Sequence, residues 1–211
     1  MEGDEHFHHE SSLTNPTRVL ALTDGVFAII MTLLVLELKV PNISNTALLY
    51  DELMQCGYKL LLYFASFLLA GVYWMGHRLI FSLIKEVNVT LVWLNIFFLM
   101  ICSLIPFGAA LLGTYPFATE TLTMYGALLT MLAGWRLLMY WYVTSNKKIL
   151  HAPVPPRRRR RVLSVMIFAP VMFFLSICIV PFLPGLSLFL FCVTPLMFVT
   201  LITIVNKVTH D

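Results

Sequence analysis

The chain has 211 residues, of which 59% are hydrophobic and only 12% are charged, and its formal net charge is +3. Soluble chains carry charge on roughly 25% of their residues, so this composition excludes a soluble globular domain and predicts an all-α integral membrane protein. The sequence has no Gly-rich phosphate loop, nucleophile elbow or HExxH motif, which argues against an enzyme and gives no reason to expect a cofactor. Nucleic-acid binding is a poor alternative for so hydrophobic a chain.

Six apolar stretches are long enough to be transmembrane helices, because about 20 residues cross the hydrocarbon core of a bilayer. Residues 1–16 form a polar, acidic tail before them. Disorder is expected there, with metal binding by His6, His8 and His9 as the weaker alternative. A short tail, 207–211, follows the six-helix domain of residues 17–206. The predicted helices are 17–39, 58–83, 89–112, 117–143, 162–180 and 186–205.

The first predicted helix, 17–39, has charged residues where a membrane helix normally has none. Arg18 and Asp24 lie near its start and Glu37 lies near its end. An acid within a membrane-spanning helix costs roughly 2.5–3.5 kcal/mol unless it meets a partner or water. The sequence therefore predicts a polar partner for Asp24.

One side of the same helix carries small and apolar residues at helical spacing. At about 100° per residue, Gly25, Ile29, Thr32 and Leu36 share a narrow arc, and Leu33 lies beside it. Small residues that let helices pack closely in lipid explain such a side, and the pattern alone favours this interpretation. The functional alternative is a pore-lining side that is polar at its mouth and apolar at its centre.

Polar residues are few in the next three predicted helices. Trp74, His77 and Arg78 recur at helical spacing near the end of the second, and Asn95 lies inside the third. Arg136 lies well inside the fourth. No two carboxylates share a predicted depth and side of the membrane, as a proton relay would require.

The long connection 144–161 is basic and contains five consecutive arginines. A topology signal explains it, and attraction to anionic lipid headgroups is compatible with that explanation. Six helices put both termini on one side of the membrane. Of the 14 Lys and Arg residues, eleven then lie on that side, two lie on the other and Arg136 lies within a helix. This excess predicts cytoplasmic termini, a cytoplasmic basic loop, and six helices instead of five or seven.

The first three predicted helices resemble those of the transmembrane protein 175 family of potassium channels. The family's first helix has Arg-x-x-x-Phe-Ser-Asp-Gly and then an Ile/Leu-rich run ending in Leu-Glu-Leu, and it resembles RVLALTDGVFAIIMTLLVLELKVP. Arg18, Asp24 and Gly25 match this motif, whereas Leu22 and Thr23 replace its Phe and Ser. The second and third helices of the family resemble YWMGHRLIF and LVWLNIFFLMICSLIPFGAALLG, so the resemblance extends to about residue 115.

This resemblance implies a potassium-selective, leak-type channel in the bacterial inner membrane. It implies a homotetramer embedded in the lipid bilayer, with the first helices lining a central pore. The family lacks the carbonyl filter loop of ordinary potassium channels and has apolar rings instead, which correspond to Ile29, Leu33 and Leu36. Thr32 lies between the upper rings and is the alternative to Leu33 as a pore-facing residue. K⁺, as the permeating ion, is then the only metal ion expected.

The resemblance also implies a hydrogen-bond network that joins the first helix to its neighbours. Its candidate members are Arg18, Thr23, Asp24, Trp74, His77 and Asn95. The alternative that stays open is a six-helix secondary transporter or membrane scaffold, in which these polar residues only hold helices together. A transporter predicts discontinuous helices and internal repeats. The two three-helix halves of this sequence show no evident repeat.

Overall fold

The computed structural model of this protein describes residues 15–38 and 49–207, and over these ranges the chain is helical. The predicted all-α class is therefore confirmed. Within the described ranges no strand forms, and Ile84 and Leu150 make one isolated antiparallel bridge. The order is α2 (Pro16–Leu36), α3 (Leu49–Phe81), α4 (Val89–Cys102), α5 (Ile105–Thr114), α6 (Thr119–Ser145), the 3₁₀ turn η2 (Lys147–Ile149), α7 (Pro156–Met166), α8 (Phe168–Ile179) and α9 (Pro184–Lys207).

The helices are those of a multi-pass membrane protein. Five segments are long and apolar enough to cross a membrane, namely Pro16–Leu36, Gly57–Phe81, Val89–Thr114, Thr119–Ser145 and Pro156–Ile179. A sixth apolar helix, α9, begins at Pro184, and the part of it with described side chains ends at Met197.

Several helix boundaries differ from the sequence prediction. The first helix ends at Leu36, not at 39, because Pro41 follows in the sequence and its ring would clash with the carbonyl of residue 37 in a continuous helix. The second helix begins at Leu49 instead of 58. The predicted basic loop 144–161 is helical at both ends, since α6 continues to Ser145 and α7 starts at Pro156. Most of the predicted N-terminal tail, with its three histidines, lies outside the described residues.

Two of the membrane segments are interrupted by a proline. α4 ends at Cys102 and α7 at Met166, four residues before Pro106 and Pro170. A proline within a helix has no N–H to donate, and its ring clashes with the carbonyl four residues earlier. Ser103, at the first break, keeps right-handed helical angles (φ −64°, ψ −15°), so the chain continues in the same direction.

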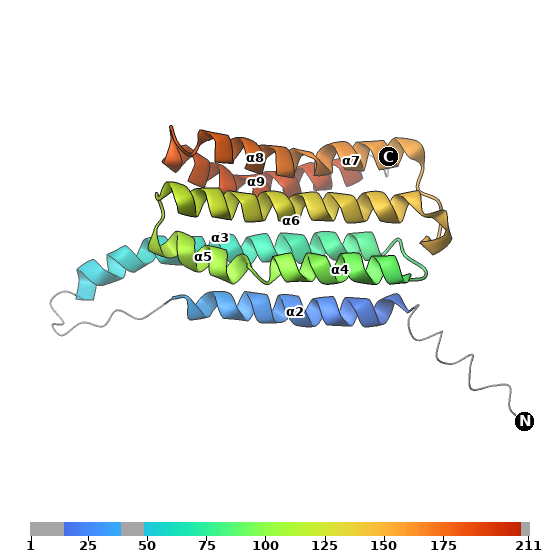
Figure 1. The fold of residues 1–211 in the computed structure, drawn as a ribbon, viewed down its shortest axis with the longest axis horizontal. Coiled ribbons are helices and arrows are strands. Elements are labelled where there is room, and N and C mark those ends of the chain that lie inside the picture. The colour runs from blue at the N-terminus through green and yellow to red at the C-terminus, as the bar shows by residue number, and fades with distance from the viewer. Residues whose placement is uncertain (1–14, 39–48, 208–211) are drawn as a thin grey trace, which may run out of the picture.

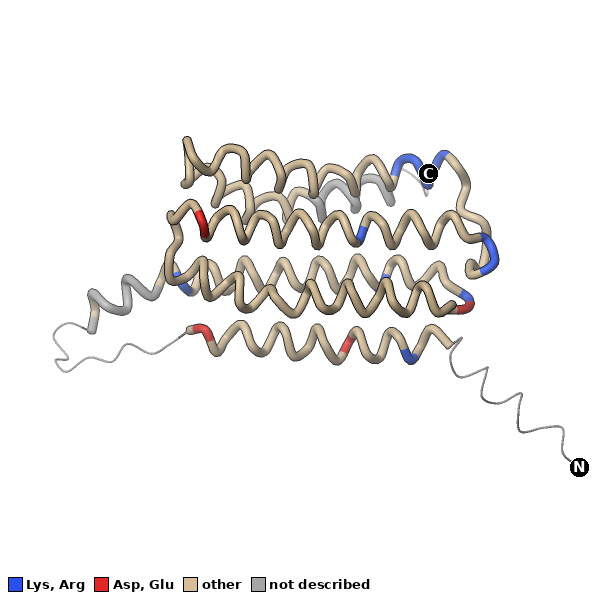
Figure 2. The backbone as a smooth tube through the Cα atoms, in the orientation of Figure 1, with Lys and Arg blue, Asp and Glu red and all other residues tan. Residues whose placement is uncertain are grey.

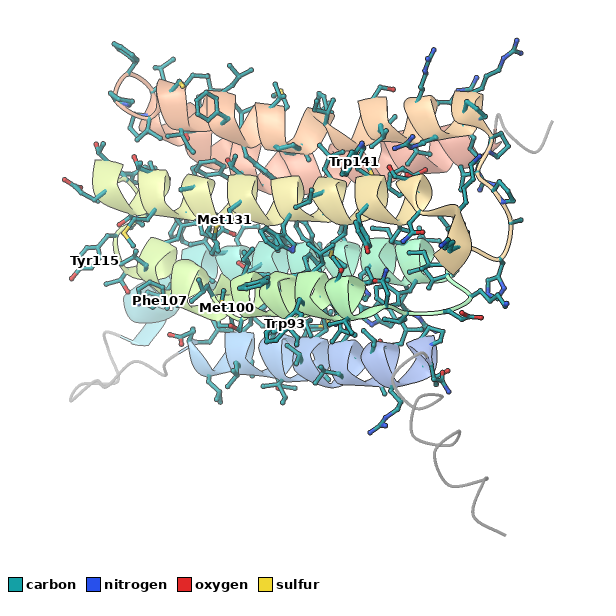
Figure 3. The ribbon with its side chains drawn as sticks, turned by 45° about the vertical axis from the view of Figure 1, so that its right-hand side comes forward. Trp93, Met100, Phe107, Tyr115, Met131 and Trp141 are labelled. Carbon is teal, nitrogen blue, oxygen red and sulfur yellow. The ribbon has the colours of Figure 1, made fainter. Side chains whose placement is uncertain are left out.

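A row of exposed side chains shows that α4 and α5 behave as one membrane segment. Trp93, Met100 and Phe107 follow one another at seven-residue intervals and lie in a row along the two helices (Figure 3). Seven residues make nearly two full turns, so the row runs unbroken across Ser103.

The helices lie side by side along the long axis of the molecule, with α2 at one edge and α7, α8 and α9 at the other (Figure 1). α6 lies between these edges and contacts α3, α4 and α5 on one side and α7, α8 and α9 on the other. α2 contacts α3, α4 and α5. Its buried residues recur at intervals of three or four, as expected of a helix covered on one side: Thr23, Phe27, Ile30 and Leu34.

Charged residues gather at the two ends of the bundle (Figure 2). Lys147, Lys148 and the five arginines of α7 lie at the end where α2 and α7 begin. Glu37, Lys59 and Glu120 lie near the opposite end. Arg136 lies between them, well inside α6, and Asp24 lies inside α2. The apolar parts of the helices therefore occupy the middle of the molecule, where the hydrocarbon core of a membrane would lie.

Candidate functional site

One side of α2 is covered by no other part of the described chain. Ile29, Leu33 and Leu36 are 59%, 42% and 68% exposed, whereas Phe27 and Leu34 on the other side are 1% exposed. Gly25 and Thr32 are exposed as well. We call the side made of Gly25, Ile29, Thr32, Leu33 and Leu36 the free face of α2, and the side made of Thr23, Phe27, Ile30 and Leu34 its buried face.

Thr32 and Leu33 occupy different parts of the free face. At 100° per residue Thr32 lies opposite the buried face, whereas Leu33 lies only about 60° from Ile30. The Thr32 hydroxyl donates to carbonyl oxygens of its own helix, with Oγ1 at 3.1 Å from the oxygen of Ala28 and 2.9 Å from that of Ile29. Its proton is used within the helix, so towards the free side Thr32 can only accept a hydrogen bond.

A buried chain of hydrogen bonds joins α2 to α3 and α4 through Asn95. The Nε2 atom of His77 lies 2.7 Å from Oδ1 of Asn95, and Nδ2 of Asn95 donates to the hydroxyl of Thr23 at 3.2 Å. The Thr23 hydroxyl donates in turn to the carbonyl oxygen of Val19 at 2.9 Å. All three bonds form when the His77 ring carries a hydrogen on Nε2 and donates it to Asn95.

The ring of His77 is fixed on both sides by phenylalanines. Its centroid lies 4.3 Å from that of Phe81 and 5.4 Å from that of Phe98, with interplanar angles of 22° and 12°. His77 and Asn95 are each 1% exposed and Thr23 is 0% exposed. The Nδ1 atom of His77 has no hydrogen-bond partner among the described residues. An apolar enclosure of this kind disfavours a charged ring and sets its orientation.

Asp24 has a different partner, Trp74 of α3. The indole Nε1 donates to Oδ1 of Asp24 at 2.7 Å. The guanidinium carbon of Arg78 lies 5.2 Å from the centroid of the same indole ring. The polar partner that the sequence requires for Asp24 is thus a neutral donor on the neighbouring helix.

The predicted network is divided in the structure. Thr23, Asn95 and His77 form one set, and Asp24 and Trp74 form another. Arg18 belongs to neither, since its side chain makes no hydrogen bond or ion pair with the described part of the chain, and it is exposed. Asp24 lies six positions after Arg18, or about 120° around the helix, which places the two side chains on different sides of α2.

No role was predicted for Arg136, and the structure places this α6 residue against α3. It is 2% exposed, and its guanidinium carbon lies 4.7 Å from the centroid of the Tyr73 ring. A Cβ atom on Gly76 would lie 2.8 Å from Nη1 of Arg136, so a larger residue there would displace the end of the Arg136 side chain. Gly76, close to Trp74 and His77 in the sequence, was the signal that could have indicated a close contact between helices here.

A cavity of about 100 Å³ lies at the opposite end of α2. It is bordered by α2, α3 and α5, and its lining includes Leu34, Leu62 and Thr114 together with one acid and one base, Glu37 and Lys59. Both charged side chains are exposed. The far end of the free face therefore lies next to groups of both signs.

Comparison with known proteins relates this arrangement to a family of channels. The family model described as the endosomal/lysosomal potassium channel TMEM175 matches residues 18–106, which contain the free face of α2 and both sets of polar contacts. A potassium channel from Chryseobacterium sp. is 40% identical over 116 residues, which cover 55% of this chain and 58% of that protein. The endosomal/lysosomal proton channel TMEM175 of Mus musculus is 23% identical over 210 residues, which cover 95% of this chain and 40% of that protein.

A solved structure extends the similarity beyond the matched sequence. The crystal structure of a lysosomal potassium-selective channel TMEM175 homolog from Chamaesiphon minutus has a TM-score of 0.78 to this chain at 26% identity. The superposition covers 88% of this chain and 96% of that chain. The shared fold thus includes helices beyond residue 106, although this chain spans only about half the length of the curated relatives it matches.

Proposed function

The chain belongs to the family of the endosomal/lysosomal potassium channel TMEM175, and from this premise we propose that four copies form a K⁺-selective, leak-type channel with the α2 helices around a central pore. The family is one of channels and not of enzymes. The names of the Chryseobacterium and Chamaesiphon proteins support K⁺ as the permeant ion. K⁺ permeation requires no cofactor.

The free face of α2 is the observation on which the proposal depends. A long row of exposed side chains at the edge of the bundle suits contact with lipid, with another copy or with a pore. This row also has a glycine, a hydroxyl and, about two turns before it, the exposed Arg18. Polar groups at these positions are costly against lipid tails but are stable against water in a pore.

The interior of one chain offers no comparable route for ions. The space between the described helices is filled by large side chains that are 2% exposed or less, among them Phe27, Phe81, Phe98 and Phe173. Protein interiors of this kind are close-packed, with few voids larger than a water molecule. We therefore place the ion path between copies of the chain.

Ile29, Leu33 and Leu36 would form the constriction in such a tetramer. Ile29 and Leu36 lie only about 20° apart around the helix and about 10 Å apart along it, so each would form its own ring. Leucine and isoleucine offer no ligand to an ion, so the constriction would act through its width and its wetting. If the middle of the free face points into the pore, Thr32 lines the pore in place of Leu33.

The two sets of polar contacts would hold α2 in its orientation. Asn95 and Trp74 each bond a residue near the start of α2, at Thr23 and Asp24. A helix held at these two points against α3 and α4 cannot turn freely about its axis. The side it presents to the pore is then set by the fold of the single chain.

The asymmetry of charge supports cytoplasmic termini in a bacterial inner membrane. The arginines of α7 and Lys147 and Lys148 lie at the end of the bundle where α2 begins (Figure 2). Lysine and arginine are enriched in cytoplasmic connections. The start of the free face would then be the cytoplasmic mouth of the pore.

A transporter or a passive scaffold has less support. The helix breaks at Ser103 and Ile167 have helical backbone angles and follow from prolines, so they are not the unwound segments that transporters place at a binding site. The name of the mouse relative makes protons a second candidate ion, at lower identity than the bacterial relative.

The test is ion flux with the purified protein in liposomes. We expect K⁺ efflux to exceed Na⁺ efflux, and crosslinking in mild detergent to stop at four chains. The same vesicles with a pH-sensitive dye measure proton flux. Absence of flux of every ion, with intact tetramers, would favour the scaffold, whereas crosslinking that stops at one or two chains would remove the pore between copies.

A further inference from the structure

Five consecutive arginines form the first turns of α7 at the basic end of the bundle (Figure 2). Four of them are exposed and the fifth, Arg159, is partly buried. At 100° per residue the exposed four cover an arc of about 160°, and Arg159 lies opposite the middle of that arc. We call these four exposed residues, Arg157, Arg158, Arg160 and Arg161, the arginine face.

Arg159 ties α7 to the end of α6. Its Nε donates to the hydroxyl of Thr144 at 3.0 Å, and its Nη2 donates to the hydroxyl of Ser145 at 2.6 Å. Each of these hydroxyls donates its own hydrogen to a carbonyl of α6, so the oxygens are free to accept. The arginine face is therefore held on the side of α7 that points away from α6.

Local electrostatics disfavour four cations at this place. The first turn of α7 contains no acid, and a helix N-terminus repels positive charge. Arg157 lies three and four residues before Arg160 and Arg161, and like charges at these spacings destabilise a helix. The ion pair of the described residues joins Lys85 to Glu86 and involves none of the arginines. Anions from outside the described chain would relieve both of these unfavourable interactions.

The length of the helix places these arginines at the level of lipid headgroups. The membrane segment Pro156–Ile179 has 24 residues, or about 36 Å, whereas the hydrocarbon core is about 30 Å thick. From Val162 onward the segment is apolar apart from Ser164 and Ser176. This apolar part, about 27 Å long, nearly matches the hydrocarbon core alone. The turns that carry the arginines extend beyond it into the region of the phosphates.

We propose that the arginine face binds the phosphate groups of anionic phospholipids in the adjacent leaflet. The guanidinium group offers donors in a planar fork that matches two phosphate oxygens at once. Basic residues next to a membrane segment are attracted to anionic lipid, and each contributes measurably near the surface. Lys147 and Lys148, which are exposed and follow Ser145, add to the same field. This binding is separate from ion conduction and does not depend on it.

The experiment measures lipid retention by the full-length protein in mild detergent. Phosphatidylglycerol or phosphatidylcholine with identical acyl chains is added, and native mass spectrometry counts the lipids that stay bound per chain. We expect phosphatidylglycerol to be retained at least about fivefold over phosphatidylcholine, with a ratio that falls as salt rises. Equal retention of the two lipids would overturn the proposal without any variant.

Two quadruple variants separate charge from geometry. R157Q/R158Q/R160Q/R161Q should bring the ratio close to one, and R157K/R158K/R160K/R161K should leave it intermediate, because lysine keeps the charge and loses the fork. The matched control is Lys59→Gln at the opposite end of the bundle, which should leave the ratio unchanged. If the glutamine variant does not insert, Arg157→Gln and Arg161→Gln are made singly, and each should lower the ratio. A ratio unchanged in all of these variants contradicts the proposal.

Free phosphate is the competing source of the same chemistry. Excess inorganic phosphate should leave phosphatidylglycerol retention largely intact, since the headgroups are held at the surface next to the arginines. Complete displacement by inorganic phosphate at constant ionic strength would assign the face to a soluble anion and overturn the assignment to lipid. A soluble acidic peptide added in the same way tests a protein partner, with the same two outcomes.

Discussion

The buried face and the free face of α2 contain similar residues in different surroundings. Each is mainly isoleucine, leucine or phenylalanine with one threonine, Thr23 on the buried face and Thr32 on the free face. Thr23 reaches Asn95 of another helix, whereas Thr32 bonds only carbonyls of its own helix. The comparison teaches that hydrophobicity does not tell the two faces apart. The two faces differ in their contacts, because only the buried face packs against other helices of the same chain. The free face is therefore available to copies of the chain.

The largest effect on stability should come from the buried face. We expect Phe27→Ala to leave a cavity against Phe98, whose ring centroid lies 6.1 Å from that of Phe27, and to cost roughly 2 kcal/mol or more. The measurement is the thermal midpoint of the purified protein in detergent, followed by intrinsic fluorescence. Ile29→Ala is the matched control on the free face and should shift the midpoint much less. Equal shifts for the two variants would mean that the free face is also packed within one chain.

A second prediction concerns Asn95, the only residue that bonds both His77 and Thr23 in the described structure. Asn95→Leu has a similar size but leaves the buried Nε2–H of His77 without an acceptor, which costs about 1–3 kcal/mol, while the Thr23 hydroxyl keeps its bond to Val19. We expect a lower thermal midpoint and a smaller tetramer fraction by size-exclusion chromatography. Thr23→Ala removes one partner only and should cost less. A midpoint unchanged in Asn95→Leu contradicts the positioning role of this set.

The fold and parts of this site follow from the sequence, and the limits have physical causes. Length and composition sufficed for the all-α membrane class, and the charge of Asp24 required a polar partner. Spacing along one helix cannot reveal which helix lies opposite, so the division between the Thr23 and Asp24 sets was missed. Pro155 and Pro156 were a helix-start signal inside the predicted basic loop, and the run of arginines concealed it. Arg136 was visible in the sequence, but its packing on Tyr73 depends on tertiary contact.

A third prediction concerns the partner of Asp24. Trp74→Phe keeps an aromatic ring and removes the Nε1 donor, so Asp24 loses its hydrogen bond within the chain. Because Asp24 is exposed and can still meet water or another copy, we expect only a modest loss, about 1 kcal/mol. Trp93→Phe is the control, because Trp93 is an exposed residue of α4 whose indole makes no hydrogen bond in the described structure. Thermal midpoints of the two variants measured in parallel give the comparison. A larger loss than that of Asn95→Leu would reverse the order of the two sets.

The smallest effects on stability and the largest on permeation are expected on the free face. A polar residue in an apolar ring should widen and hydrate the path, because such rings act through width and wetting. Ile29→Asn should therefore raise conductance and lower the preference for K⁺ over Na⁺. The measurement is the reversal potential under K⁺ and Na⁺ gradients in planar bilayers. Tetramers are verified first, so that lost assembly is not taken for lost selectivity.

The same recordings determine which side of the free face points into the pore. Thr32 lies opposite the buried face and Leu33 lies at its edge, so the two positions report different rotations of α2. If Thr32 lines the pore, Thr32→Ala changes permeation while Leu33→Ser mainly lowers the thermal midpoint. If Leu33 lines it, Leu33→Ser raises conductance and Thr32→Ala has little effect. Unchanged selectivity in Ile29→Asn, Thr32→Ala and Leu33→Ser, with intact tetramers, would remove α2 from the pore and leave its free face as a packing surface between copies or towards lipid.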